Sequence, residues 1–117
     1  MSDVVVFDST GALDRVCGDS DLLNELFGML QEQAGIIVPE IQELLKSSDL
    51  PNTSKKAHCL KGALGNLWAN VAKNVAQELE IAAKNGDANK AETLIKVLEG
   101  EIETFYGVFK TYQSEKR

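Results

Sequence analysis

The only histidine in the chain, His58, is followed by Lys61 and Gly62 one helical turn later and by Gly65 two turns later. On a helix, positions i, i+3, i+4 and i+7 share a face. The sequence therefore groups a nucleophilic imidazole, a cation and two stretches of backbone without side chains. The neutral imidazole is available near pH 7, because histidine changes charge between about pH 5 and 8. A protein surface that accepts a phosphoryl group and passes it on requires this combination of residues.

The apolar pattern around His58 predicts that its side chain lies outside the core. Apolar residues before and after it follow the i, i+3, i+7, i+10 spacing of a buried helical stripe. At about 100° per residue, the centre of this stripe lies roughly 130° from His58. A lone histidine is more often structural than chemical, but we expect this one to be exposed. The stripe consists of Ala57, Leu60, Leu64 and Leu67.

The first part of the chain predicts one short helix followed by two longer ones. A lead-in over residues 1–7 precedes a short helix over residues 8–17. Residues 18–20, Gly-Asp-Ser, stop this helix and supply N-cap oxygens for the next one. Pro39 fits the first turn of a third helix and favours an extended residue before it. We expect a loop over residues 47–52. The apolar side chains expected to face the core are Leu22, Leu23, Leu26, Phe27, Leu30, Ile41, Leu44 and Leu45.

The second part of the chain predicts further helices joined by short turns. Gly65 and Asn66 both tolerate the left-handed conformation of a helix C-cap, so the helix of the histidine should end there. The next helix should begin near Ala69, and residues 85–87, Asn-Gly-Asp, should end it and cap a last long helix. Short connections imply antiparallel neighbours. We therefore predict an all-α fold, an up-down antiparallel four-helix bundle with a short additional N-terminal helix, as a single domain over residues 1–117. Its remaining core residues should be Val71, Ala72, Val75, Ala76, Leu79, Ala91, Leu94, Ile95, Leu98, Ile102, Phe105, Phe109 and Tyr112.

A chain reversal after the histidine helix would bring Glu80 beside His58. Residues equally far on either side of a hairpin turn are neighbours, so positions 77–80 would lie next to positions 55–58. If residues 54–84 instead formed one unbroken helix, the two side chains would be about 33 Å apart. Glu80 is thus either a partner of the histidine or a solvated glutamate at a helix rim.

Composition and charge exclude several classes of function. The 117 residues include 12 basic and 18 acidic ones, a net charge of −6, and scattered lysines argue against nucleic-acid binding. The run from Val4 to Phe7 is too short to span a bilayer, and Asp3 stands where a secretory signal carries positive charge. We therefore expect a cytoplasmic protein without membrane association. Cys17 and Cys59 lack metal-site spacing and predict reduced, partly buried thiols. The negative net charge favours partners whose contact rims are basic.

A set of short motifs runs in a fixed order along most of the chain, over roughly residues 6–84. The motifs are Val6-Phe7-Asp8, Leu13-Asp14-Arg15, Gly18-Asp19, Leu22-Leu23-Asn24-Glu25-Leu26, His58-Cys59-Leu60-Lys61-Gly62, Gly65-Asn66-Leu67, Ala69 and Leu79-Glu80. This pattern resembles the histidine phosphotransfer (Hpt) domains of multi-step bacterial phosphorelays, in particular those attached to hybrid sensor histidine kinases. One position departs from it. Trp68 stands where the family usually has glycine, and it either caps the end of the bundle or widens the turn, in a packing or a partner-contact role.

The resemblance implies a role for each candidate residue. His58 would take a phosphoryl group from a phospho-aspartate of a receiver domain, through Nε2, and become the phosphohistidine of a phosphoprotein. Lys61 would stabilise the charge on the phosphoryl oxygens, unless it is merely a solubilising lysine. Gly62 would let the partner approach closely, and Gly65 would serve either access or the helix end. Glu80 would hold the proton on Nδ1.

The resemblance also implies the partners, which are response-regulator receiver domains and a hybrid sensor histidine kinase. The sequence contains no glycine-rich phosphate loop, so we expect a phosphoryl carrier with no ATP site rather than an enzyme. We expect no cofactor or metal on this chain, with Mg²⁺ on the receiver partner. Nothing demands a dimer, so a monomer is the simplest expectation.

Three other functions compete with this interpretation. An Hpt-like docking module would bind a receiver or kinase without being phosphorylated, but it would have no need of the intact set His58, Lys61 and Gly62. An enzyme with His58 as general base would need a pocket with further convergent polar groups. A metal or haem protein is the weakest alternative, because one histidine cannot supply the usual ligands.

Overall fold

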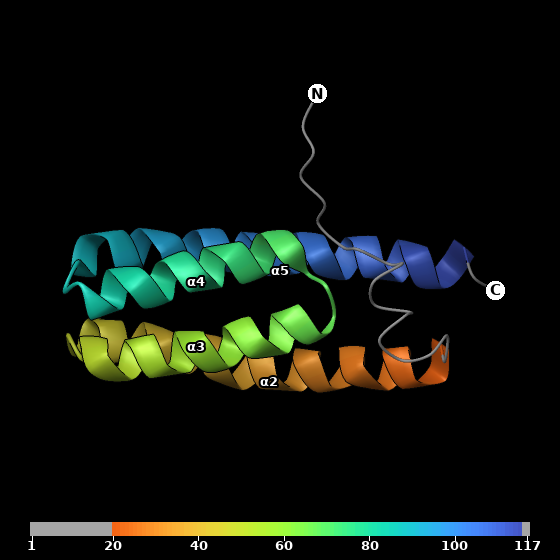
Figure 1. Cartoon of the computed structure of the whole chain (residues 1–117), viewed down its shortest axis with the longest axis horizontal. Coiled ribbons are helices and arrows are strands. Elements are labelled where there is room, and N and C mark those ends of the chain that lie inside the picture. Colours follow the sequence, from red (N-terminus) through yellow and green to blue (C-terminus); the bar gives the residue numbers. More distant parts are fainter. Residues whose placement is uncertain (1–19, 116–117) are drawn as a thin grey trace, which may run out of the picture.

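The computed structural model describes residues 20–115. They form the four helices α2 (Ser20–Lys46), α3 (Leu50–Asn66), α4 (Asn70–Lys84) and α5 (Ala88–Glu115). Figure 1 shows these helices side by side, with successive helices running in opposite directions. The predicted all-α, up-down bundle is confirmed. The short helix predicted over residues 8–17 and the lead-in over residues 1–7 lie outside the described residues. Within the described part, no helix is long and apolar enough to cross a membrane.

The core contains most of the side chains that the apolar pattern predicts. The four stripe residues, three in α3 and Leu67 at its C-cap, are each at most 1% exposed. Phe27 of α2 stacks on Phe109 of α5 with ring centroids 4.1 Å apart, which fastens the first and last described helices together. The prediction for Leu22 is wrong, because its side chain is exposed. Leu22 and Leu23 are about 100° apart around the helix, and Leu23 takes the inward position.

Pro39 lies inside α2, so the predicted start of a separate helix there, with an extended Val38 before it, is wrong. Ala34, Val38 and Ile41 are all buried and form one stripe that continues past the proline. Burial of such a stripe outweighs the cost of a proline in a helix, about 3 kcal/mol. The carbonyl that loses its helical donor belongs to Gly35, which is exposed to solvent, so water can satisfy it.

Helix α3 begins at Leu50, inside the loop predicted over residues 47–52. Asp49 is its N-cap, and the Asp49 carboxylate accepts a hydrogen bond from the backbone N–H of Asn52 at 3.2 Å. Pro51 lies in the first turn, where its missing N–H has no helical partner to lose. An N-cap aspartate shortly before a proline is a helix-start signal. The sequence interpretation assigned that role to the other proline of the chain.

All three turns between the described helices have the same geometry. A residue in the left-handed conformation follows each helix, namely Ser48 (φ 57°), Trp68 (φ 54°) and Gly86 (φ 76°). Its N–H and that of the next residue donate back to carbonyls of the last helical turn, which is a Schellman motif. Each motif reverses the chain within three residues and so keeps neighbouring helices antiparallel.

Trp68 occupies the left-handed position of the turn between α3 and α4. Its N–H donates to the carbonyl of Gly65, and the N–H of Ala69 donates to that of Leu64, both at 3.1 Å. Helix α3 ends at Asn66 as predicted, although the left-handed residue is Trp68 rather than Gly65 or Asn66. The indole packs against the core. The tryptophan therefore caps this end of the bundle and does not widen the turn.

We expect Ser48→Gly to raise the free energy of unfolding by about 1 kcal/mol and the thermal midpoint by about 4 °C. The substitution removes the steric cost of a left-handed serine at an exposed position. Ser47→Gly is the matched control, because Ser47 has no positive φ and its hydroxyl donates to the carbonyl of Leu44 at 3.1 Å. Thermal unfolding followed by circular dichroism measures both. A higher thermal midpoint in Ser47→Gly, or an unchanged midpoint in Ser48→Gly, would contradict this account of the turn.

Candidate functional site

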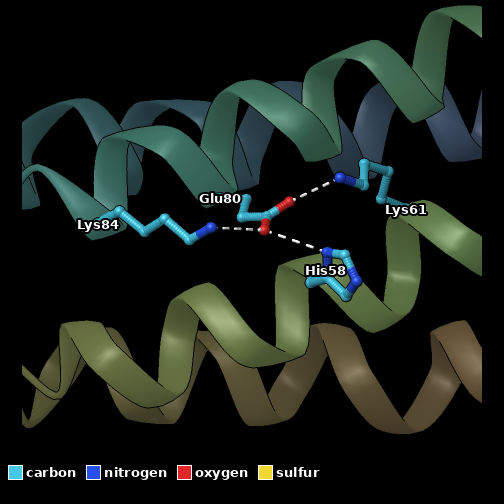
Figure 2. A network of polar contacts seen from close by, with 4 residues as sticks. All are labelled: His58, Lys61, Glu80 and Lys84. Carbon is cyan, nitrogen blue, oxygen red and sulfur yellow. Dashed lines mark hydrogen bonds and ion pairs between the residues drawn. The ribbon is translucent and has the colours of Figure 1, made fainter.

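His58 lies in the middle of α3, on the side of the helix that faces away from the core. Its side chain is 65% exposed, as the position of the apolar stripe predicts. Figure 2 shows the imidazole beside α4, with Nδ1 directed at a side chain of that helix and the other ring nitrogen on the far side of the ring. The imidazole therefore has one nitrogen engaged inside the protein and one available to a partner.

The group that faces the imidazole is the carboxylate of Glu80 on α4. Its Oε2 lies 3.1 Å from Nδ1 of His58, across the hairpin and 22 residues away in sequence. The Glu80 side chain is only 8% exposed. A buried carboxylate is costly unless it is paired and hydrogen-bonded. The contact is the one that the hairpin geometry predicts.

Two lysines pair with this carboxylate from opposite ends, as Figure 2 shows. Lys61 Nζ donates to Oε1 of Glu80 at 2.9 Å, and Lys84 Nζ lies 3.2 Å from Oε2. Lys84 was missed by the sequence interpretation, although its i, i+4 spacing from Glu80 is the signal for such a pair. The resemblance implies that Lys61 stabilises the charge on phosphoryl oxygens. In the structure its ammonium is bonded to Glu80.

The lysines keep Glu80 ionised. The hydrogen bond from Lys61, helped by Lys84, lowers the pKa of Glu80 to about 2, against the effect of burial, which raises it. An ionised carboxylate only accepts hydrogen bonds. The ring nitrogen that faces it, Nδ1, must therefore carry the proton. In the neutral imidazole this leaves a lone pair on Nε2, the exposed nitrogen.

Comparison with known protein families agrees with this geometry. The family model of the Hpt domain matches residues 25–106, from the first turns of α2 to the middle of α5. This chain belongs to the Hpt domain family. The family transfers phosphoryl groups through a histidine in two-component phosphorelays, as a carrier rather than a classical enzyme. Searches of curated proteins and of solved structures each returned no significant match.

The two glycines near the histidine of this Hpt domain have different surroundings. A Cβ added to Gly62 would meet no atom within 4 Å, and the residue is exposed. Nothing within residues 20–115 requires a glycine there. A Cβ added to Gly65 would lie 3.5 Å from Cδ of Lys73, which is ordinary contact. Gly65 also lies in the last turn of α3, where its carbonyl accepts the capping bond of the turn. The structure therefore places Gly65 at the helix end.

The described part of this Hpt domain has no metal-binding cluster among its His, Cys, Asp and Glu residues. Cys59, next to His58, is a free and exposed thiol, so the prediction that it is partly buried is wrong. It lies about 100° from His58 around the helix, on the side away from the apolar stripe. Cys17 lies outside the described residues.

Proposed function

We propose that this Hpt domain relays a phosphoryl group between aspartates of receiver domains by way of a phosphohistidine at His58. One observation carries the proposal: Nδ1 of an exposed imidazole lies 3.1 Å from the ionised carboxylate of Glu80. That contact selects the tautomer whose lone pair is on the exposed Nε2. Because the side chain is 65% exposed, that lone pair is presented to a partner, as phosphoryl acceptance requires.

The proposed step forms one bond and breaks one. The lone pair of Nε2 attacks the phosphorus of an aspartyl phosphate on the receiver, and the phosphorus–oxygen bond to the aspartate breaks. The electron pair of that bond leaves with the aspartate carboxylate. The ring, phosphorylated on Nε2 and still protonated on Nδ1, is then positively charged, and Glu80 stabilises it by a charge-assisted hydrogen bond. Attack by a second receiver's aspartate on the phosphorus reverses the step.

The neighbours of His58 support this reaction in different ways. An ammonium has three donors, and Lys61 uses one on Glu80, so it can also donate to a phosphoryl oxygen. The open space over Gly62 admits the backbone of a partner to the imidazole. The receiver would supply Mg²⁺ from its own acidic pocket. Because the receivers donate and remove the phosphoryl group, the carrier needs no ATP site and no cofactor of its own.

The test is phosphoryl transfer from a panel of radiolabelled, phosphorylated receiver domains. We expect the label to move to this domain, and to be acid-labile and base-stable, as a phosphoramidate is. Receivers whose phosphorylated aspartate is replaced by asparagine are the control and should transfer nothing. Acid-stable label would contradict a phosphohistidine. Binding to a receiver without any transfer would instead establish the alternative, a docking module that is not phosphorylated.

A further inference from the structure

The charges of the described helices are unevenly distributed. Helices α3 and α4, which hold the site, together carry five lysines and only two glutamates. Helix α2 carries five acidic residues and one lysine, and α5 carries five glutamates and three lysines. The net charge of −6 for the whole chain therefore conceals a basic face.

On α3, two lysines border the histidine. Lys55 precedes His58 by one turn and is exposed on the crest of the helix, about 60° from the imidazole. Lys61 follows His58 by one turn on the side of α4. A third lysine, Lys56, points to α2, where it pairs with Glu40 at 3.4 Å. Lys56 is therefore neutralised locally and is not part of the basic face.

On α4, two more lysines lie along the helix face that meets α3. Lys73, Glu80 and Lys84 follow the i, i+7, i+11 spacing of a single stripe. The stem of Lys73 lies against Gly65 of α3, with Cδ 3.5 Å from the position of a Cβ there. Lys84 is 64% exposed and reaches Glu80 from the other end. Lys55, Lys61, Lys73 and Lys84 form what we call the lysine rim.

The lysine rim holds more positive charge than the nearby acids neutralise. Glu80 is the one carboxylate on its α4 stripe, and both of its oxygens are already paired. Glu78, the other acid of α4, lies about 160° away around the helix. No ion pair within the described residues involves Lys55 or Lys73. The surplus charge therefore lies on the α3–α4 face that carries His58, with Lys55 exposed and Lys73 half-buried.

Helix α2, which packs against α3, exposes two large apolar side chains. Met29 and Ile36 of α2 are 56% and 62% exposed. Met29 also lines a groove between α2 and α3, together with Gln33, Ala63 and Asn66.

We infer that the lysine rim selects receiver domains with an acidic surface around the phosphorylated aspartate and steers them onto His58. The inference rests on the proposed function and names its partner more narrowly. The inference contradicts the expectation based on net charge, which is that the contact surface of the partner is basic. Opposite charges accelerate encounter, and rim charges act mainly on the association rate. The acidic helices α2 and α5 repel the same partner, so the attraction also orients it.

The test compares two charge-reversal variants with the same net charge. Lys55→Glu/Lys73→Glu alters the rim at residues that have no part in the proposed phosphoryl step. Lys96→Glu/Lys110→Glu is the control on α5, where both lysines are exposed. The probes are an isolated receiver domain with an acidic surface around its aspartate, and the same domain with those acids replaced by lysine. Stopped-flow mixing measures the association rate.

We expect the rim variant to bind the acidic receiver about tenfold more slowly at low ionic strength. The difference should largely vanish near 1 M salt, where the Debye length is about 3 Å. The control should change the rate less than twofold, and the lysine-bearing receiver should prefer the rim variant. Equal rates for the rim variant and the control would overturn the inference, as would a failure of both receivers to bind. If the association rates differ as expected but no phosphoryl group is transferred, the inference about the lysine rim holds and only the proposed function is overturned.

Discussion

Replacing His58 with glutamine is expected to abolish phosphoryl acceptance while the bundle stays folded. The glutamine amide cannot form the nitrogen–phosphorus bond, so labelled receivers should leave no label on this variant. The imidazole is 65% exposed and, among residues 20–115, makes one hydrogen bond, to Glu80. Losing that bond should lower the free energy of unfolding by about 1 kcal/mol. Transfer of label measures the first effect, and urea unfolding measures the second.

Cys59→Ser is the matched control for the histidine variant. Cys59 is the adjacent residue and an exposed nucleophile, yet it has no part in the proposed step. Its serine variant should accept label at the wild-type rate. If label persists on His58→Gln and disappears from Cys59→Ser, the nucleophile is the thiol of Cys59 and not His58. A large loss of stability in His58→Gln would show that the imidazole has a structural role that its exposure does not suggest.

The apolar spacing was sufficient to predict the bundle, because one helical face in each segment is apolar and the turns between segments are short. The same pattern located His58 on the outside of α3 and, through the hairpin, brought Glu80 beside it. Both inferences use only helix geometry and the place of chain reversal. Neither depends on the exact ends of the helices, so the errors at the proline and at the start of α3 did not affect them.

At Pro39 and Trp68 a tertiary effect outweighed a local signal, whereas at the start of α3 and at Lys84 a local signal was present in the sequence. Pro39 is a helix breaker by local preference, but the buried residues on both sides of it keep α2 continuous. Trp68 takes a left-handed conformation that local preference assigns to glycine, because its indole packs against the core. The bond from Lys61 to Glu80 depends on how two helices approach each other, which spacing within one helix cannot give. The charge distribution required the fold as well, since net charge averages over all faces.

Glu80→Gln is expected to lower the free energy of unfolding by about 2 kcal/mol at pH 7. The pKa of about 2, against the ordinary 4.5, sets the upper limit, and solvent screens the pairing with the exposed Lys84. Because the pKa of this carboxyl is lowered by folding, its contribution is complete above about pH 4.5. It is lost as the pH falls toward 2, where the folded state also binds the proton. The wild type should therefore converge on the variant as the pH falls from 5 to 2. Urea unfolding at each pH measures the difference.

Glu80→Gln should also slow phosphoryl transfer for a reason separate from stability. The amide oxygen can still accept from Nδ1, so the tautomer with a lone pair on Nε2 is retained. The positive charge of the phosphorylated ring then loses its carboxylate, and hydrogen bonds to charged groups are worth about 1.5–3 kcal/mol, so we expect transfer at least tenfold slower. Glu78→Gln, an exposed change on the opposite flank of α4, is the control and should leave stability and transfer unchanged. Normal transfer by Glu80→Gln, together with the expected loss of stability, would show that Glu80 holds the hairpin together but contributes no charge to the phosphorylated state.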